Sequence, residues 1–166
     1  MNPGVSVSWP GSKHKPVAYK GASCFALAPD GKQLIRCDLT WGKGALQVHA
    51  VGERARGLKF ADDVPEFTAV ASAPDGATFV TANVEGALEL WDLATKVLVK
   101  TFSGAQGVTR LAFSPDGRRI AAGSAQQAWV FEVASGKKSV LTGAGQALAW
   151  TAEGTLLRAM NGTLLR

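Results

Sequence analysis

The 166-residue sequence contains no long apolar run and no concentrated charge. No stretch approaches the roughly 20 apolar residues that a membrane-spanning helix needs, so we expect no such helix and no membrane partner. The first fifteen residues lack a positively charged segment followed by an apolar core, and a cytoplasmic location is therefore expected. The net charge of +5 includes no run of five like charges, so it permits contact with nucleic acid or an acidic protein without showing it.

Histidine and cysteine are too scarce for the common catalytic and metal sites. The chain has only His14, His49, Cys24 and Cys37. The spacing around the turn at 28–33 places the two cysteines opposite each other, and we interpret them as small buried thiols. A zinc site would need both histidines as its two further ligands, and His49 is expected to be a packed ring in a strand. We therefore expect no metal and no cofactor.

Sequence motifs of enzymes are also missing. Neither Ser-Gly pair belongs to a G-x-S-x-G elbow, and no glycine-rich loop is followed by the lysine of a phosphate-binding site. The chain is therefore predicted not to be an enzyme.

The sequence does contain a repeat. Pro-Asp-Gly occurs at 29–31, 74–76 and 115–117, and Ala-Glu-Gly follows at 152–154, so the glycines are 45, 41 and 37 residues apart. A period near forty is typical of repeat architectures. Proline fixes φ, aspartate caps its own turn and glycine accepts a positive φ, which predicts a tight turn at each site.

Each period also holds four short runs of strand-forming residues. In the third period they read VTRLAF, RRIAAG, AWVFEV and SVLT, joined by loops too short for crossover helices. This pattern predicts an all-β protein of antiparallel four-stranded meanders, with at least twelve strands and no helix longer than about two turns. Leu111, Phe113, Ile120 and Val130 are expected to lie buried between stacked sheets.

These features resemble the WD-repeat β-propeller family. Residues 67–133 match best, because the first of their two repeats ends in Trp91-Asp92; the neighbouring repeats read Val48-His49 and Phe131-Glu132 there. The resemblance covers about 16–166 and implies a propeller with about four blades per chain. The Gly-His pair common in the family is missing, so its buried polar network of histidine, aspartate, serine or threonine and tryptophan is expected to be absent.

The resemblance divides the chain into an N-terminal extension, 1–15, and a set of blades. Complete blades are expected at 23–61, 67–102 and 108–142, and the last, 146–166, lacks an outer strand that 16–20 is expected to supply. Four blades are few for this family. The ring could close within one chain, two chains could close it as eight blades, or the chain could be half of a longer protein; we favour the two-chain ring, a homodimer.

Function is expected to lie in the loops. In the family's geometry one loop face of this chain is basic, with Lys13, Lys15, Arg54, Arg56, Arg118, Arg119, Lys137 and Lys138 as candidate binding residues. The other is acidic, with Asp38, Asp62, Asp63, Glu66 and Glu85. Trp41 is a further candidate, because tryptophan is enriched at binding hot spots. The main hypothesis is a protein-interaction scaffold or sensor module; the alternative is a polyanion or nucleic-acid binder that uses the basic face.

Overall fold

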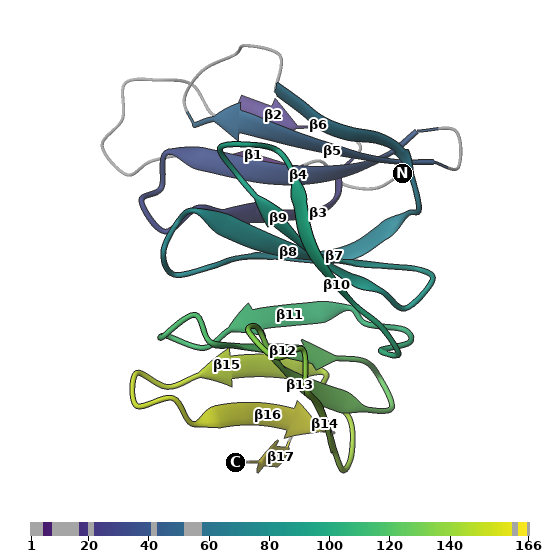
Figure 1. Cartoon of the computed structure of the whole chain (residues 1–166), viewed down its shortest axis with the longest axis vertical. Helices are drawn as coiled ribbons and strands as arrows, with labels where there is room; N and C mark the ends of the chain where they lie inside the picture. The colour runs from purple at the N-terminus through teal and green to yellow at the C-terminus, as the bar shows by residue number, and fades with distance from the viewer. Residues whose placement is uncertain are drawn as a thin grey trace.

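Strands form all the regular structure of the described chain. The computed structural model describes residues 5–7, 17–19, 22–40, 43–51, 58–160 and 163–165, and no helix occurs among them (Figure 1). Three sheets have four strands, one has three, and a separate pair completes the set. The predicted all-β class and the predicted twelve strands in four-stranded meanders are confirmed.

The strands follow one another in simple meanders, each pairing antiparallel with the next in the chain. Sheet 1 contains β3 (Ala22–Leu27), β4 (Gln33–Thr40), β5 (Lys43–Ala50) and β6 (Leu58–Val64). Sheet 2 contains β7 (Phe67–Ser72), β8 (Thr78–Asn83), β9 (Leu88–Asp92) and β10 (Leu98–Phe102). Sheet 3 contains β11 (Arg110–Phe113), β12 (Arg119–Gly123), β13 (Ala128–Glu132) and β14 (Lys138–Leu141). Sheet 4 contains β15 (Ala147–Trp150), β16 (Leu156–Met160) and β17 (Thr163–Leu165).

The three Pro-Asp-Gly segments form the turns that the sequence predicted. Their glycines have φ values of 68°, 68° and 69°, in the left-handed region that favours glycine. Each aspartate carboxylate accepts a hydrogen bond from the backbone N–H two residues later, for example Asp75 from Ala77 at 2.8 Å. The turn between β3 and β4 also sets the predicted register, in which Cys24 lies opposite Cys37.

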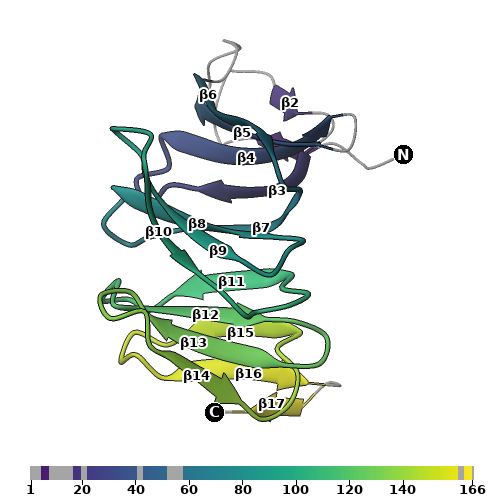
Figure 2. The same cartoon turned by 45° about the vertical axis from the view of Figure 1, so that its right-hand side comes forward.

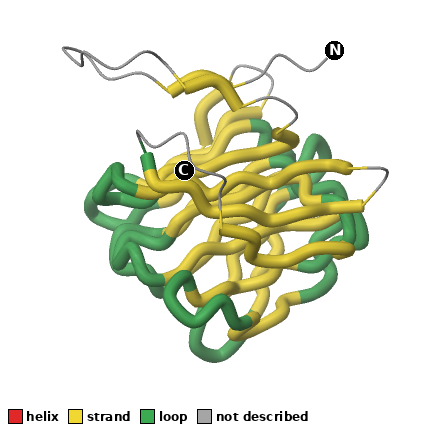
Figure 3. The backbone as a smooth tube through the Cα atoms, turned by 90° about the horizontal axis from the view of Figure 1, so that it is seen from above, coloured by secondary structure: helices red, strands yellow, loops and turns green. Residues whose placement is uncertain are grey.

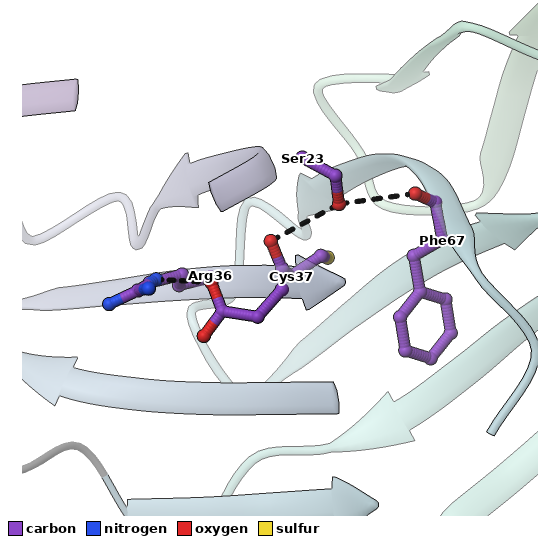
Figure 4. A network of polar contacts seen from close by, with 5 residues as sticks. Ser23, Arg36, Cys37 and Phe67 are labelled. Atoms are coloured by element: carbon purple, nitrogen blue, oxygen red, sulfur yellow. Dashed lines mark hydrogen bonds and ion pairs between the residues drawn. The ribbon is translucent and has the colours of Figure 1, made fainter. Parts of the chain in front are cut away.

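The four sheets are stacked face to face along the longest axis of the molecule (Figures 1 and 2). The first strands of successive sheets run side by side, β3 with β7, β7 with β11 and β11 with β15. Ser23 joins the first two sheets, because its hydroxyl lies 3.2 Å from the Cys37 carbonyl oxygen and 3.3 Å from that of Phe67 (Figure 4). This arrangement is consistent with blades of a propeller.

Apolar side chains fill the spaces between the sheets. Ile35, Cys37 and Leu46 of sheet 1 pack against Phe79 and Trp91 of sheet 2. A larger cluster lies between sheets 2 and 3; its buried members are Ala69, Val80, Ala82, Leu88, Leu90, Phe102, Ala105, Val108, Ile120, Ala122, Trp129 and Phe131. Burial of this apolar surface is the main favourable term for joining the repeats.

The predicted core residues are buried to different degrees. Ile120 is fully buried, as expected, but Leu111, Phe113 and Val130 are only partly buried, which corrects the prediction. Leu111 and Phe113 lie on β11, the first strand of sheet 3, which pairs with a neighbouring strand on one side only. Val130 shares a face with Ala121 and lies on the side of sheet 4, which has three strands where the other sheets have four.

One hydrogen bond of the polar network that was expected to be absent is present. The Trp91 indole Nε1–H donates to the Thr81 hydroxyl over 3.1 Å, in a buried setting between sheets 1 and 2. The Thr81 hydroxyl in turn lies 3.4 Å from the carbonyl oxygen of Glu89. Apolar packing is therefore supplemented here by a buried polar pair.

The described stack does not close into a ring within one chain. Sheets 1 and 4 lie at opposite ends of the molecule (Figures 1 and 2). The segment expected to complete sheet 4 instead forms β2 (Val17–Tyr19), which pairs with β1 (Val5–Val7) and not with β17. Strand exchange between two chains stays a prediction.

Candidate interaction face

The turns of each sheet gather at its two ends, so the stack has two loop-bearing sides (Figure 3). Within one sheet, the turn between strands one and two is tied to the turn between strands three and four: Leu93 N–H donates to the Ala77 carbonyl oxygen, and Val133 N–H to that of Arg118, both at 2.9 Å. We call the side that carries these turns the turn face. The opposite side carries the b–c turns, between strands two and three, and the connections between sheets.

Two grooves lie on the turn face, one at each junction between the first three sheets. The first has a volume of about 640 Å³ and is lined by Pro74, Asp75, Pro115, Asp116, Gly117, Arg118, Arg119, Glu132, Val133 and Ala134. The second has a volume of about 560 Å³ and is lined by Ala28, Pro29, Asp30, Gln33, Pro74, Asp75, Gly76, Ala77, Leu93 and Ala94. In each groove the turns of successive repeats supply equivalent residues, such as Ala94 and Ala134.

Hydrogen bonds lower the pKa of two aspartates at the turn face. The Ser114 hydroxyl donates to the Asp116 carboxylate, and this hydrogen bond, together with the Arg118 N–H, holds the pKa of Asp116 below its usual value. Hydrogen bonds from the Thr95 backbone and hydroxyl lower the pKa of Asp92 in the same way. Both aspartates are therefore fixed negative charges next to the grooves.

Several basic side chains form hydrogen bonds between neighbouring repeats. Lys100 Nζ donates to the carbonyl oxygens of Val133 (3.0 Å) and Ala134 (2.7 Å), and so joins sheet 2 to a turn of sheet 3. Lys138 Nζ donates to the Gly104 carbonyl oxygen at 3.1 Å, back toward sheet 2. These ammonium groups satisfy backbone carbonyls of a neighbouring repeat.

Two arginine side chains form hydrogen bonds that join sheet 3 to sheet 4. Arg119 Nη2 donates to the Gly154 carbonyl oxygen at 3.0 Å, and its guanidinium carbon lies 4.5 Å from the centre of the Trp150 ring. Arg158 Nη1 donates to the Thr142 carbonyl oxygen at 2.9 Å. Two of the candidate binding residues, Arg119 and Lys138, thus contribute to contacts between sheets.

The structure places four of the nine candidate residues. Arg118 and Lys137 are exposed on the turn face, and Arg118 lines the first groove. Arg119 is partly buried against Trp150, and Lys138 begins β14. The other candidates lie outside the described residues: Lys13, Lys15, Trp41, Arg54 and Arg56.

The acidic loop face expected from the sequence lies only partly in loops. Of the residues that the sequence assigns to the basic face and the structure describes, six are basic (Lys32, Lys96, Arg118, Arg119, Lys137, Lys138) and four are acidic (Asp30, Asp75, Asp116, Glu153), and the basic face stays a prediction. On the opposite side, Asp38 is not an exposed loop residue: it lies in β4, is 6% exposed and pairs with Arg36. Asp62 and Asp63 belong to strand β6.

Burial changes the ionisation of the acidic groups inside the stack. Desolvation raises the pKa of Asp38, although the neighbouring Arg36 guanidinium acts in the opposite direction. Desolvation also raises the pKa of Glu89, which lies beside the Trp91–Thr81 pair. Within the ranges described, no group of three or more His, Cys, Asp or Glu side chains could hold a metal ion, and no helix could span a membrane.

A family model matches one segment of this architecture. Residues 96–130 match the model described as WD domain, G-beta repeat. The matched segment contains the outer strand of sheet 2 and the first strands of sheet 3, so the sequence repeat bridges two neighbouring sheets. One segment of the chain thus matches a WD repeat, and the antiparallel sheets are consistent with the blades of a WD-repeat, propeller-like protein.

Proposed function

We propose that this protein is a non-catalytic scaffold that binds a protein partner through the grooves of the turn face. WD repeats generally mediate protein–protein interactions, which supports a scaffold role. The observation that supports this face is the recurrence of a groove at two successive junctions, with equivalent residues in each. Similar grooves at successive junctions suit an extended peptide segment that contacts several repeats one after another.

The lining of the first groove indicates what such a segment would carry. Pro74, Pro115 and Val133 offer apolar surface. Three acidic residues face two arginines in this groove, and one of these arginines, Arg119, already contacts Gly154 and Trp150. An extended segment with apolar side chains and a basic residue fits this chemistry best.

Filling the grooves tests the proposal. Ala94 and Ala134 are exposed, occupy equivalent positions and each line one groove, so Ala94→Trp and Ala134→Trp should block binding without disturbing the sheets. The immobilised protein would select peptides from a random library, and the enriched peptides would be titrated against each variant. We expect at least tenfold weaker binding to one or both tryptophan variants.

The control variant is Ala152→Trp, an exposed alanine of the sheet 4 turn that lines neither groove. It should bind as the wild-type protein does. A selection that enriches no peptide, or peptides that bind all three variants equally well, would rule out the grooves as the binding surface.

The alternative function, polyanion binding, makes a different prediction. Arg118 and Lys137 are exposed on the turn face and could contact phosphates. Binding to a single-stranded oligonucleotide would then weaken steeply as salt rises, because phosphate contacts release counterions. Binding of peptides with little salt dependence and no binding of the oligonucleotide would favour the scaffold. The cytoplasmic location, the sensor role and the absence of catalysis stay predictions beside it.

A further inference from the structure

We propose that the two ends of the stack bind each other between two copies of this chain. Sheet 4 of one copy would pack on sheet 1 of the other, and the reverse contact would close a ring of eight sheets. This inference concerns the end sheets and does not depend on the grooves of the turn face.

Each internal junction uses the same positions of the first strand. We call the side of a sheet toward the preceding sheet its leading face, and the side toward the following sheet its trailing face. The leading-face positions lie four and two residues before the turn, and they are occupied by Val70 and Ser72, Leu111 and Phe113, and Leu148 and Trp150. All six side chains are partly buried, because a preceding sheet covers them.

Phe25 and Leu27 hold the same two positions in sheet 1. They are 47% and 45% exposed, although they are as large and apolar as their counterparts in sheets 3 and 4. The two middle strands, β4 and β5, are already covered on this leading face, since Leu34 is 1% and His49 6% exposed. The open part is therefore the first strand, through which successive sheets make their closest contacts.

Sheet 4 offers the matching surface at the other end of the stack. The register places Ala147, Ala149, Leu157, Ala159 and Leu164 together on its trailing face, and all five are apolar. Leu164 is 65% exposed, and Ala149 is exposed as well. An exposed apolar sheet face of this kind marks an interaction site.

The two end faces also match in size. At the junctions before sheets 3 and 4, small trailing-face residues of one first strand lie near large leading-face residues of the next: Ala71 and Phe113 pack against the same buried cluster, and the Trp150 indole Nε1–H donates to the Ala112 carbonyl oxygen at 3.1 Å. At the first junction the leading-face residues, Val70 and Ser72, are smaller. At the free ends, Ala147 and Ala149 are the small side chains, and Phe25 and Leu27 are the large ones. One chain thus carries both halves of a junction, which favours a second copy as the occupant.

The turn glycines give independent evidence for this pairing. A Cβ atom at Gly76 would lie 3.8 Å from Pro29, at Gly117 3.9 Å from Pro74, and at Gly154 3.2 Å from Arg119, so each turn touches the preceding repeat. A Cβ atom at Gly31 would have nothing within 4 Å. The first turn therefore has room for the turn of another sheet, where the other three have a neighbour.

Solution mass tests the proposal. Light scattering after size exclusion should give the wild-type protein twice the chain mass of 17.3 kDa. The leading-face variant Phe25→Glu/Leu27→Glu and the trailing-face variant Ala149→Glu should each lose the two-chain species, because each places charge in both junctions of the ring. These side chains are exposed in the single chain, so both variants should fold. The matched control is Val99→Glu on the outer strand β10, where Val99 is 56% exposed, and it should keep the wild-type mass.

Mixing the two variants separates head-to-tail pairing from other dimers. The leading-face variant has an intact trailing face, and the trailing-face variant an intact leading face, so an equimolar mixture should recover a two-chain species through one intact junction. A wild-type mass of one chain, an assembly larger than two chains, a trailing-face variant that stays dimeric, or a mixture that stays monomeric would overturn the proposal.

Discussion

At the scale of single residues, the stack is held by contacts that lie between repeats. Lys100, Lys138, Arg119 and Arg158 donate to backbone carbonyls of a neighbouring sheet or its connection. Hydrogen bonds from charged donors are stronger than neutral ones where water is excluded, and weaker where the donor is exposed. The buried Trp91–Thr81 pair serves the junction between sheets 1 and 2 in a similar way.

This pair leads to a prediction about stability. Thr81→Val keeps the shape of the side chain but removes the acceptor of the Trp91 indole N–H, leaving a buried donor without a partner. The free energy of unfolding should fall by about 1–3 kcal/mol. Chemical denaturation, monitored by tryptophan fluorescence, measures this change in the free energy of unfolding.

The control is Thr101→Val, at an exposed position of the same sheet, which should change stability by less than about 0.5 kcal/mol. If the two variants were equally stable, the hydrogen bond would contribute nothing. A double-mutant cycle with Trp91→Phe should show less than additive losses, because both substitutions remove one interaction.

At the scale of elements, close approach between connections limits which residues fit. A Cβ atom on Gly123, at the end of β12, would collide with the backbone carbonyl of Gly145 in the connection to sheet 4. The Gly145 N–H donates to the Ser124 carbonyl oxygen at 3.0 Å, which holds the two segments together. Glycine at 123 is therefore required by packing and not by an unusual φ.

A comparison of two glycine substitutions tests this reading. Gly31→Ala adds a methyl group in open space and costs the strain of a positive φ, about 1–2 kcal/mol. Gly123→Ala should cost more than Gly31→Ala, because the backbone at Gly145, in the connection to sheet 4, must move away. Thermal unfolding of both variants measures the difference, and a Gly123→Ala protein with wild-type stability would contradict the packing described.

The sequence predicted the turns and the strand register better than it predicted which side chains are buried and how the sheets contact one another. Local turn chemistry determined the Pro-Asp-Gly turns and the Cys24–Cys37 register, both of which the structure confirms. The prediction of Asp38 and Asp62 as loop residues is wrong, because Asp38 is buried in β4 and Asp62 belongs to β6, and a polar side chain within a strand gives the same local pattern as one in a loop. The grooves and the hydrogen bonds between sheets depend on the spacing between neighbouring sheets, and no local sequence pattern encodes that spacing.

At the scale of the whole molecule, successive sheets pack along their first strands and the described stack stays open. Sheets 1 and 4 lie at opposite ends of the described stack (Figures 1 and 2), and each has exposed apolar residues on its outward side, Phe25 and Leu27 in sheet 1 and Leu164 in sheet 4. Repeats of this kind bury their apolar faces only against neighbours, so the end faces are the natural sites for further contacts. The two-chain ring that we propose would use these end faces.

The distance between the first and last turns within one chain tests this openness most directly. Two double-cysteine variants would carry spin labels: Lys32→Cys with Ala152→Cys, and Lys32→Cys with Ala77→Cys. All three positions are exposed and lie on turns between strands one and two. Both variants would also carry Cys24→Ala, and the remaining natural cysteine, Cys37, is buried. Excess unlabelled protein would suppress distances between chains. Pulsed electron–electron double resonance should give a clearly longer distance for the pair in sheets 1 and 4 than for the pair in the adjacent sheets 1 and 2. Equal distances would mean that four sheets close into a ring within one chain, and would contradict the open stack.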